Sequence, residues 1–256
     1  PGNARTDLSA FLSLYYLVPF SIKPTDAGAL NTLYNLHATI ADQWNADRNL
    51  TAEQIANGEA NFSDQYLADR AAMLGWVLKS NLDDTSGRAD GLNAIYVDIA
   101  SGTNLSPIIV SNTPKYIFGS NNADTGVTAI AGGTKADHLY GMGGNDTING
   151  GNGNDYIEGG ADDDTLNGGE DADQLYGGAG QDTLNGGEGN DILIGGTEVD
   201  ILDGGTGNDQ LKGGAGVDVY QFTGSNYGTD TITDTDGQGV IMIGSNPQLS
   251  GGTLKA

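Results

Sequence analysis

Large hydrophobic residues in the second half of the chain recur with a period of nine. From residue 132 to residue 221 this period runs without an insertion, and an aspartate stands two residues before each hydrophobic position. The hydrophobic positions are Leu139, Ile148, Ile157, Leu166, Leu175, Leu184, Leu193, Leu202, Leu211 and Tyr220. The aspartates are Asp137, Asp146, Asp155, Asp164, Asp173, Asp182, Asp191, Asp200, Asp209 and Asp218. Such a pattern is typical of a solenoid, in which each repeat forms one rung that contacts only its neighbours.

Each repeat reads Gly-Gly-x-Gly-x-Asp-x-U-x, where U is the large hydrophobic residue. We expect a glycine-rich turn with backbone at positive φ, followed by a three-residue strand that points only U inward. Successive repeats then alternate between two sides, so that strands eighteen residues apart pair. The pattern therefore predicts a mainly β fold, a parallel β-roll or β-helix solenoid of nonapeptide repeats.

Helical spacing dominates the N-terminal part of the chain. A dense apolar stretch at 7–18 predicts a buried helix, and residues spaced three or four apart predict a second helix that begins after Thr25. Thr51 and Gln54 have the spacing of a capping box, and Ser63 is placed to begin a longer helix. A small α-helical subdomain should therefore precede the roll.

Short β-rich runs at 94–99, 107–110 and 116–118 connect the two halves, and residues 119–124 resemble a degenerate repeat that we do not expect to bind metal. The predicted domains are a helical subdomain at 1–92, a short β bridge with the degenerate repeat at 93–131, the roll at 132–221 and a C-terminal cap at 222–256. Because the chain opens at Pro1 without a methionine, we expect the helical part to be the end of a larger passenger.

Composition narrows the choice of partner. The net charge is -24, and residues 118–256 carry 22 acidic side chains against three basic ones. This charge opposes nucleic acid and anionic membranes and favours cations. The chain has no cysteine, which excludes disulfides and thiolate metal sites. No apolar run is long enough to predict a transmembrane segment.

The repeats contain many carboxylates and bury little apolar surface, so we expect a cation that prefers oxygen ligands to stabilise them. One buried hydrophobic side chain per nine residues contributes much less than ordering nine residues costs, so we expect metal-free repeats to be unfolded. Calcium takes six to eight oxygen ligands in tolerant geometry, whereas magnesium demands a tighter octahedron. Residues 132–221 carry 18 acids and two bases, a charge of -16 that eight Ca²⁺ would neutralise.

Alternation of the repeats predicts about eight sites, each between two aspartates eighteen residues apart. Interior aspartates would then serve two ions. The predicted pairs are 137/155, 146/164, 155/173, 164/182, 173/191, 182/200, 191/209 and 200/218.

The repeat unit resembles closely the hemolysin-type calcium-binding nonapeptide of RTX proteins, over about 90 residues. That resemblance implies a right-handed roll whose turn carbonyls complete each calcium site. The carbonyls it implies here belong to Gly151, Gly153, Gly178, Gly180, Gly187 and Gly189. It further implies a secreted, extracellular or cell-surface protein, exported by type I secretion machinery from low cytosolic calcium, that folds outside on Ca²⁺ binding and stabilises its passenger.

Some turns depart from the unit. Lys135, Asp162, Asp171 and Glu198 occupy the third glycine position, and Met142 replaces a second glycine. Non-glycine residues adopt left-handed backbone at a cost, Asp more readily than Lys or Glu. The central pairs should therefore bind better than the end pairs, with a weakness near Glu198.

Residues outside the repeat core form two faces. The aromatic face carries His138, Tyr140, Tyr156, Glu158, Gln174, Tyr176, Ile192, Ile194, Gln210 and Lys212. We expect it to pack against the helical subdomain, or against a partner. The opposite face repeats Thr-x-Asn at 147–149, 165–167 and 183–185, which suits solvent exposure or an adhesin-like ice- or glycan-binding surface.

No catalytic motif of a hydrolase, zinc protease or P-loop enzyme is present. His37 lies on an apolar helix face and His138 lies outside the repeat motif, neither with a visible nucleophile. We therefore expect no enzyme activity from this chain itself, while the full-length protein could be a secreted, lipase-like hydrolase or toxin carrying this RTX tail.

Overall fold

The computed structural model describes residues 46–57, 59–60, 62–82, 94–100, 103–105, 113–125, 129–223, 227–244 and 246–250. The helices expected at 7–18 and after Thr25, the residue His37 and the strand expected at 107–110 lie outside the described residues. No helix within them has the length and apolar character needed to cross a membrane.

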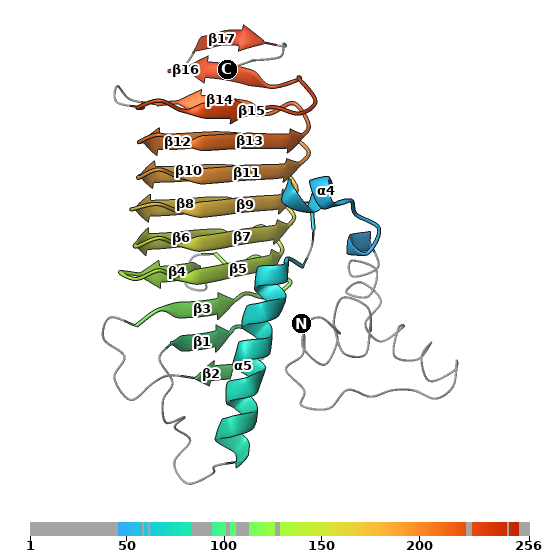
Figure 1. The fold of residues 1–256 in the computed structure, drawn as a ribbon, viewed down its shortest axis with the longest axis vertical. Coiled ribbons are helices and arrows are strands. Elements are labelled where there is room, and N and C mark those ends of the chain that lie inside the picture. The colour runs from blue at the N-terminus through green and yellow to red at the C-terminus, as the bar shows by residue number, and fades with distance from the viewer. Residues whose placement is uncertain are drawn as a thin grey trace.

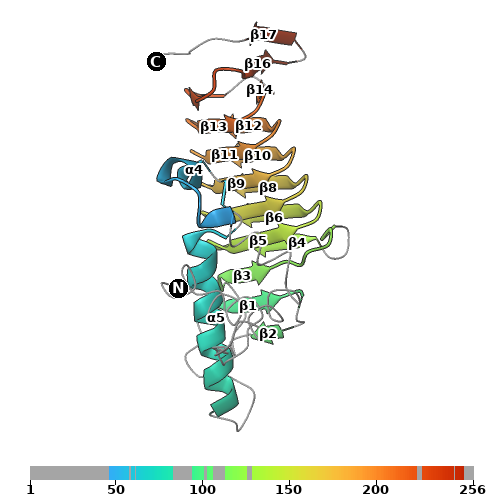
Figure 2. The ribbon, with the colours of Figure 1, turned by 90° about the vertical axis from the view of Figure 1, so that its right-hand side faces the viewer.

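The strands form two stacked sheets whose members alternate along the chain (Figures 1 and 2). The nine-stranded sheet contains, in spatial order, β15 (Thr231–Thr233), β13 (Gln210–Ala215), β11 (Ile192–Thr197), β9 (Gln174–Ala179), β7 (Tyr156–Ala161), β5 (His138–Gly143), β3 (Lys115–Phe118), β1 (Ile95–Asp98) and β2 (Thr103–Leu105). The eight-stranded sheet contains β17 (Asn246–Ser250), β16 (Val240–Ile243), β14 (Val219–Phe222), β12 (Ile201–Thr206), β10 (Thr183–Glu188), β8 (Thr165–Glu170), β6 (Thr147–Asn152) and β4 (Ile130–Gly133). Pairing is parallel except between β1 and β2 and between β16 and β17, so the predicted mainly β, parallel solenoid is confirmed.

Strand register follows the eighteen-residue alternation. Leu184 pairs with Leu166 on one side and Leu202 on the other, which places equivalent side chains directly above one another. The large hydrophobic residues from Leu139 to Tyr220 form one internal row at 0–1% exposure, continued at one end by Ile130 and Ile117. The same register aligns Thr147, Thr165 and Thr183 on the outer face.

Strand length differs from the prediction. Complete rungs carry six-residue strands that continue through both glycines of the following turn, whereas a three-residue strand was expected. The strand continues because the first glycine occupies the next inward position after U and is buried there. Without a side chain, it fits a place where a second large residue would not. Each rung therefore presents two inward positions, one large and one minimal.

The turns have the predicted left-handed backbone, even where glycine is absent. Gly151 and Gly153 have φ of 111° and 106°. Met142, Asp162, Asp171 and Glu198 adopt φ between 75° and 85°, each at a cost of about 1–2 kcal/mol. Lys135, in the turn after the four-residue strand β4 (Ile130–Gly133), does not share this conformation.

Parallel pairing extends beyond the repeats at both ends. β3 pairs with β5 before the first complete rung. After Gln221, β15 pairs with β13 and β16 pairs with β14, while the antiparallel β17 ends the stack. The domain boundaries at 93, 132 and 222 remain predictions, and the sheets run continuously across the last of them.

Two described helices precede the roll. The short α4 (Ala52–Ala56) begins at the predicted capping box, since Gln54 N donates to Thr51 Oγ1 at 3.2 Å and Thr51 N donates to Gln54 Oε1 at 3.0 Å. The longer α5 (Asp64–Leu82) begins after Ser63, whose Oγ accepts a bond from Tyr66 N at 2.9 Å. Both capping predictions are confirmed.

Helix α5 lies along the lower rungs of the nine-stranded sheet (Figures 1 and 2). Asp69 Oδ2 accepts a bond from Tyr140 OH at 2.5 Å and lies 2.6 Å from His138 Nδ1. Arg70 forms a buried ion pair with Asp98 at 3.0 Å. These contacts confirm that the aromatic face packs against the helical part of the chain, and they give His138 an interface role.

Candidate metal centre

The ten repeat aspartates form two columns, one at each edge where turns give way to strands. Each aspartate stands immediately before its strand, so those that precede the nine-stranded sheet share one column and those that precede the eight-stranded sheet share the other. The first column contains Asp137, Asp155, Asp173, Asp191 and Asp209. The second contains Asp146, Asp164, Asp182, Asp200 and Asp218. All ten are 0–2% exposed.

Within a column, each aspartate is bonded to the next through one carboxylate oxygen. Asp146 N donates to Asp164 Oδ1 at 2.8 Å, and Asp164 N donates to Asp182 Oδ1 at 2.8 Å. All eight pairs predicted from the sequence are linked in this way, at 2.8–3.1 Å. The Oδ1 atoms thus hold neighbouring rungs in register.

The second carboxylate oxygen of every repeat aspartate is buried and has no hydrogen-bond partner. This applies to Oδ2 of all ten aspartates, from Asp137 to Asp218. A buried oxygen without a partner is costly, and a buried carboxylate without a counter-charge more so. Ten such atoms at one fixed position mark a requirement for a positively charged ligand.

A backbone carbonyl accompanies eight of these ten oxygens, those from Asp137 to Asp200. A Cβ on Gly150 would overlap both Asp155 Oδ2 and the carbonyl oxygen of Gly168. The two oxygens therefore lie on the same side of Gly150, and the first glycine of the repeat is required by this close approach rather than by its φ angle. The same arrangement recurs at Gly132, Gly141, Gly159, Gly168, Gly177, Gly186 and Gly195.

Four of the six glycine carbonyls implied by the family resemblance point toward the next rung of the same sheet. The carbonyl oxygens of Gly151, Gly178, Gly187 and Gly189 lie against the glycine eighteen residues later. Eighteen residues after Gly153 and Gly180 stand Asp171 and Glu198, which are not glycines. The positions of the Gly153 and Gly180 carbonyls are therefore not fixed by this type of contact. Sequence reasoning missed the first-position carbonyls, such as that of Gly168, although the invariant first glycine was a signal for close backbone approach.

Burial raises the pKa of every repeat aspartate. Loss of water is the largest cause; the bond from the neighbouring backbone N–H lowers the pKa, and nearby carboxylates raise it further. The pKa is raised to about 9 for Asp164, about 8 for Asp173 and Asp200, about 7 for Asp146, Asp155 and Asp182, and about 6 for Asp191 and Asp218. The pKa of Asp137 and Asp209 is raised as well. Without a cation, the columns hold their negative charge at a cost.

Asp124 and Asp230 show where the columns end. Asp124 N donates to Asp146 Oδ1 at 2.6 Å, but Asp124 Oδ2 itself accepts a bond from Ser120 N at 2.8 Å. At the other end Asp230 Oδ1 accepts a bond from Asp209 N at 2.9 Å. Asp230 thus continues the first column, and the sequence did not show it because 21 residues rather than 18 separate it from Asp209.

The donor set is made of oxygens only. Among the described residues, no three His, Asp or Glu side chains gather at one point that could hold a metal ion. Each candidate site therefore has at most two carboxylates and needs backbone carbonyls to complete it. Such mixed carboxylate and carbonyl oxygens fit Ca²⁺, which accepts six to eight oxygen ligands.

Comparison with known families agrees with this chemistry. The family model of the RTX calcium-binding nonapeptide repeat (four copies) matches residues 118–157, 131–166, 150–184, 158–193 and 194–221. A search of curated proteins found no match. Residues 118–221 of this chain are therefore RTX calcium-binding nonapeptide repeats, a type of repeat that binds calcium in a β-roll.

Proposed function

We propose that about eight Ca²⁺ ions bind between the rungs, each held by a pair of aspartates eighteen residues apart. The single observation that supports this most strongly is the set of ten buried Oδ2 atoms without a hydrogen-bond partner. The proposed side-chain ligands are the ten repeat aspartates. The proposed backbone ligands are the carbonyls of Gly151, Gly153, Gly178, Gly180, Gly187 and Gly189, with those of first-position glycines such as Gly168 as added candidates.

In this proposal, the two carboxylate oxygens of each repeat aspartate have different roles. Oδ1 accepts the backbone N–H of the preceding rung in its column and sets the spacing. Oδ2 remains available for the ion. The turn residues, at positive φ, carry carbonyls into the gap between rungs. When bound, calcium supplies the positive charge that the buried carboxylates lack.

Calcium-dependent folding would serve secretion. We propose that the chain is secreted, that type I secretion machinery exports it unfolded from low cytosolic calcium, and that it folds outside the cell. The folded roll would then stabilise the passenger on its N-terminal side. Extracellular calcium modules bind with dissociation constants of about 10⁻⁴–10⁻³ M, which suits a switch between the two compartments. The family match and the excess of acidic residues support this proposal.

A calcium titration followed by far-ultraviolet circular dichroism tests the central claim. We expect a cooperative gain of β signal as Ca²⁺ is added to the metal-free chain, and little change with the same concentrations of Mg²⁺. The titration is done at pH 8. A spectrum that shows full β content in a chelator at that pH, or that responds equally to both ions, would contradict the proposal.

A further inference from the structure

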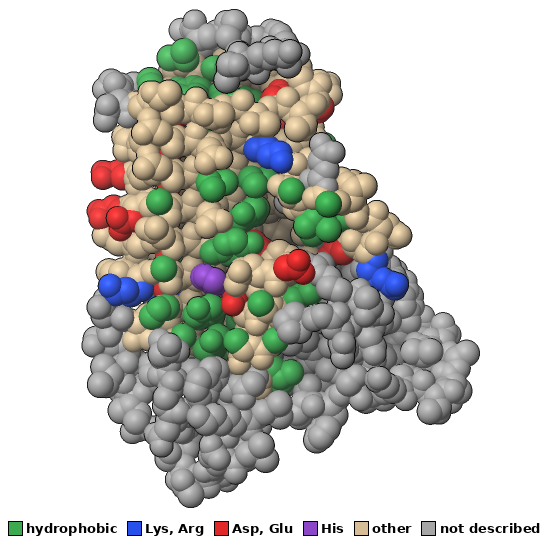
Figure 3. All heavy atoms as spheres, in the orientation of Figure 1, with side chains coloured by type: hydrophobic (Ala, Val, Ile, Leu, Met, Phe, Trp, Pro, Cys, Tyr) green, Lys and Arg blue, Asp and Glu red, His purple; other side chains and the backbone are tan. Residues whose placement is uncertain are grey.

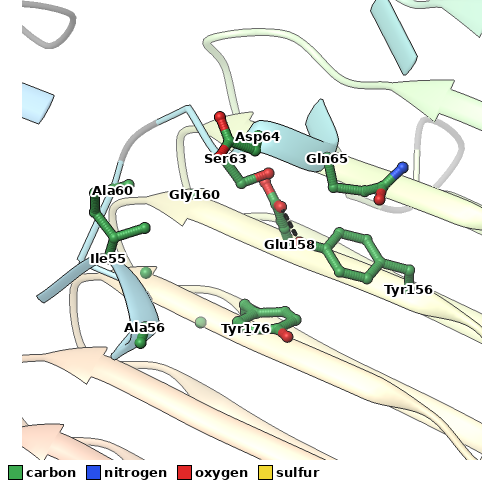
Figure 4. Close-up of a pocket in the computed structure, with 12 residues that line it drawn as sticks. Ile55, Ala56, Ala60, Ser63, Asp64, Gln65, Tyr156, Glu158, Gly160 and Tyr176 are labelled. Atoms are coloured by element: carbon green, nitrogen blue, oxygen red, sulfur yellow. Dashed lines mark hydrogen bonds between the residues drawn. The ribbon is translucent and has the colours of Figure 1, made fainter. Parts of the chain in front are cut away.

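A hollow of about 480 Å³ lies between the connection from α4 to α5 and the aromatic face (Figure 4). Ile55, Ala56 and Ala60 line it on the helical side. Tyr156 and Glu158 from β7 and Tyr176 from β9 line it on the strand side. Gly160, Gly177 and Gly178 leave the strand side open, because no side chain rises from them. Hydrophobic side chains gather on this side of the molecule (Figure 3).

Glu158 contributes a carboxylate to the strand side of the hollow. Its carboxylate accepts a bond from Tyr156 OH at 2.5 Å and another from the Ser63 hydroxyl. Both donors are neutral. The pKa of Glu158 is raised to about 7, mainly by burial; Asp69 contributes to the rise, while the two hydroxyl bonds and His138 oppose it. His138 is itself held by Asp69.

None of the residues that line the hollow is a lysine or an arginine. Asp64 adds a second carboxylate to the lining. A half-buried carboxylate that is hydrogen-bonded to two neutral hydroxyls gains from a cation that enters beside it. An anionic ligand would meet Glu158 and Asp64 with the same sign of charge. The hollow therefore selects for a positively charged occupant.

Two aromatic rings add a second preference. The rings of Tyr156 and Tyr176 lie with centroids 5.2 Å apart and planes inclined by 40°, so they form adjoining walls. Aromatic faces attract organic cations and, most effectively, quaternary ammonium groups that carry little bound water. Ile55 and Ala60 offer an apolar surface opposite these rings, where a short hydrocarbon chain can lie.

We propose that this hollow is a binding site for a small organic ammonium ion that carries a short alkyl group. The cationic head would lie against Tyr156, Tyr176 and Glu158, and the alkyl part against Ile55 and Ala60. The hollow adjoins the proposed calcium sites, because Gly178 lines it, but it contains none of the repeat aspartates. It goes beyond calcium binding, although it requires the folded roll.

The test compares two ligands of equal shape and different charge. Choline and its neutral carbon analogue 3,3-dimethylbutan-1-ol are titrated by calorimetry into the full chain in saturating calcium. We expect saturable one-to-one binding of choline and at least tenfold weaker binding of the neutral analogue. Equal binding of both compounds, or binding of neither, would overturn the proposal. Preferential binding of a neutral sugar such as methyl glucoside would overturn it too.

Variants then assign the binding to these residues. Glu158→Gln keeps an acceptor for Tyr156 and removes the charge, so choline affinity should fall at least tenfold. Tyr176→Leu removes a ring and should lower affinity about fivefold, whereas Tyr176→Phe should retain it. The matched control is Glu188→Gln, which removes an exposed carboxylate from β10 and should leave affinity unchanged. Each variant is first checked for the calcium-induced circular dichroism signal, and the two-ligand comparison needs no variant at all. Unchanged affinity in Glu158→Gln would refute the assignment.

Discussion

At the scale of single residues, the two oxygens of each repeat aspartate have different surroundings: Oδ2 has no hydrogen-bond partner, whereas Oδ1 accepts a backbone bond in every aspartate that has a preceding one in its column. We predict that Asp164→Asn raises the calcium concentration at the folding midpoint by about tenfold, the equivalent of about 1.4 kcal/mol. Asn keeps an oxygen to accept the bond from Asp146 N but removes the charge at a position that belongs to two proposed sites. A calcium titration followed by circular dichroism measures the shift.

The control for this prediction is Asp124→Asn. Asp124 occupies the same place in its column but both of its carboxylate oxygens already have Ser120 as a partner. Its midpoint should stay close to that of the unmodified chain. Equal shifts in the two variants would show that the orphan Oδ2 atoms are not the ligands.

The first position of each repeat must be glycine because there is no space for a side chain. We predict that Gly150→Ala lowers the free energy of unfolding by about 1–3 kcal/mol, because its Cβ would overlap Asp155 Oδ2 and the carbonyl of Gly168. The comparison is Gly237→Ala, where φ is 73° but nothing lies within 4 Å of the added atom. Urea unfolding in saturating calcium measures both. A smaller loss at Gly150 than at Gly237 would argue against close approach as the reason for this glycine.

At the scale of elements, the repeats were predictable and the packing of the helix was predictable only in outline. The period of nine predicted the register, the internal row and the aspartate columns, because each rung contacts only its neighbours. It missed the six-residue strands, because burial of a glycine leaves no hydrophobic signal, and it missed Asp230, because three extra residues break the period. The aromatic face identified the surface for α5, but no local pattern identifies Asp69 as the partner of His138, which lies 69 residues away.

The buried ion pair between Arg70 and Asp98 tests how α5 is held. We predict that Arg70→Ala destabilises the packed helix by about 3–5 kcal/mol, because it leaves Asp98 buried without its counter-charge. Arg70 also lies 4.6 Å from the centre of the Phe118 ring, so part of the loss is packing. Hydrogen exchange of the α5 amides measures the effect. The double variant Arg70→Ala with Asp98→Ala should recover part of the loss, and a double variant less stable by the full sum of both single changes would contradict the ion-pair explanation.

At the scale of the whole molecule, the roll is a stack whose two edges are lined with buried acid. Eight of the ten repeat aspartates have folded-state pKa values of about 6–9, above the usual value near 4. The folded metal-free chain therefore binds protons more tightly than the unfolded chain does. Its stability is therefore greatest below the unfolded pKa and is lost as the pH rises through 6–9. At the proposed calcium sites, calcium and protons would compete for the same carboxylates.

Opposite pH dependences with and without calcium follow from this competition. In a chelator, we predict that the chain gains β signal between pH 8 and pH 5, where the columns become protonated. With calcium at the pH 8 midpoint concentration, lowering the pH should instead displace the ion, and the midpoint should rise as the pH falls. Binding at pH 5, where we expect the metal-free columns to be folded and protonated, should release protons, because Asp164, Asp173 and Asp200 exchange their protons for the ion. Circular dichroism across pH, together with potentiometric titration of the released protons, measures both effects. If calcium binding at pH 5 released no protons and its midpoint did not change between pH 8 and pH 5, the buried aspartates could not be its ligands.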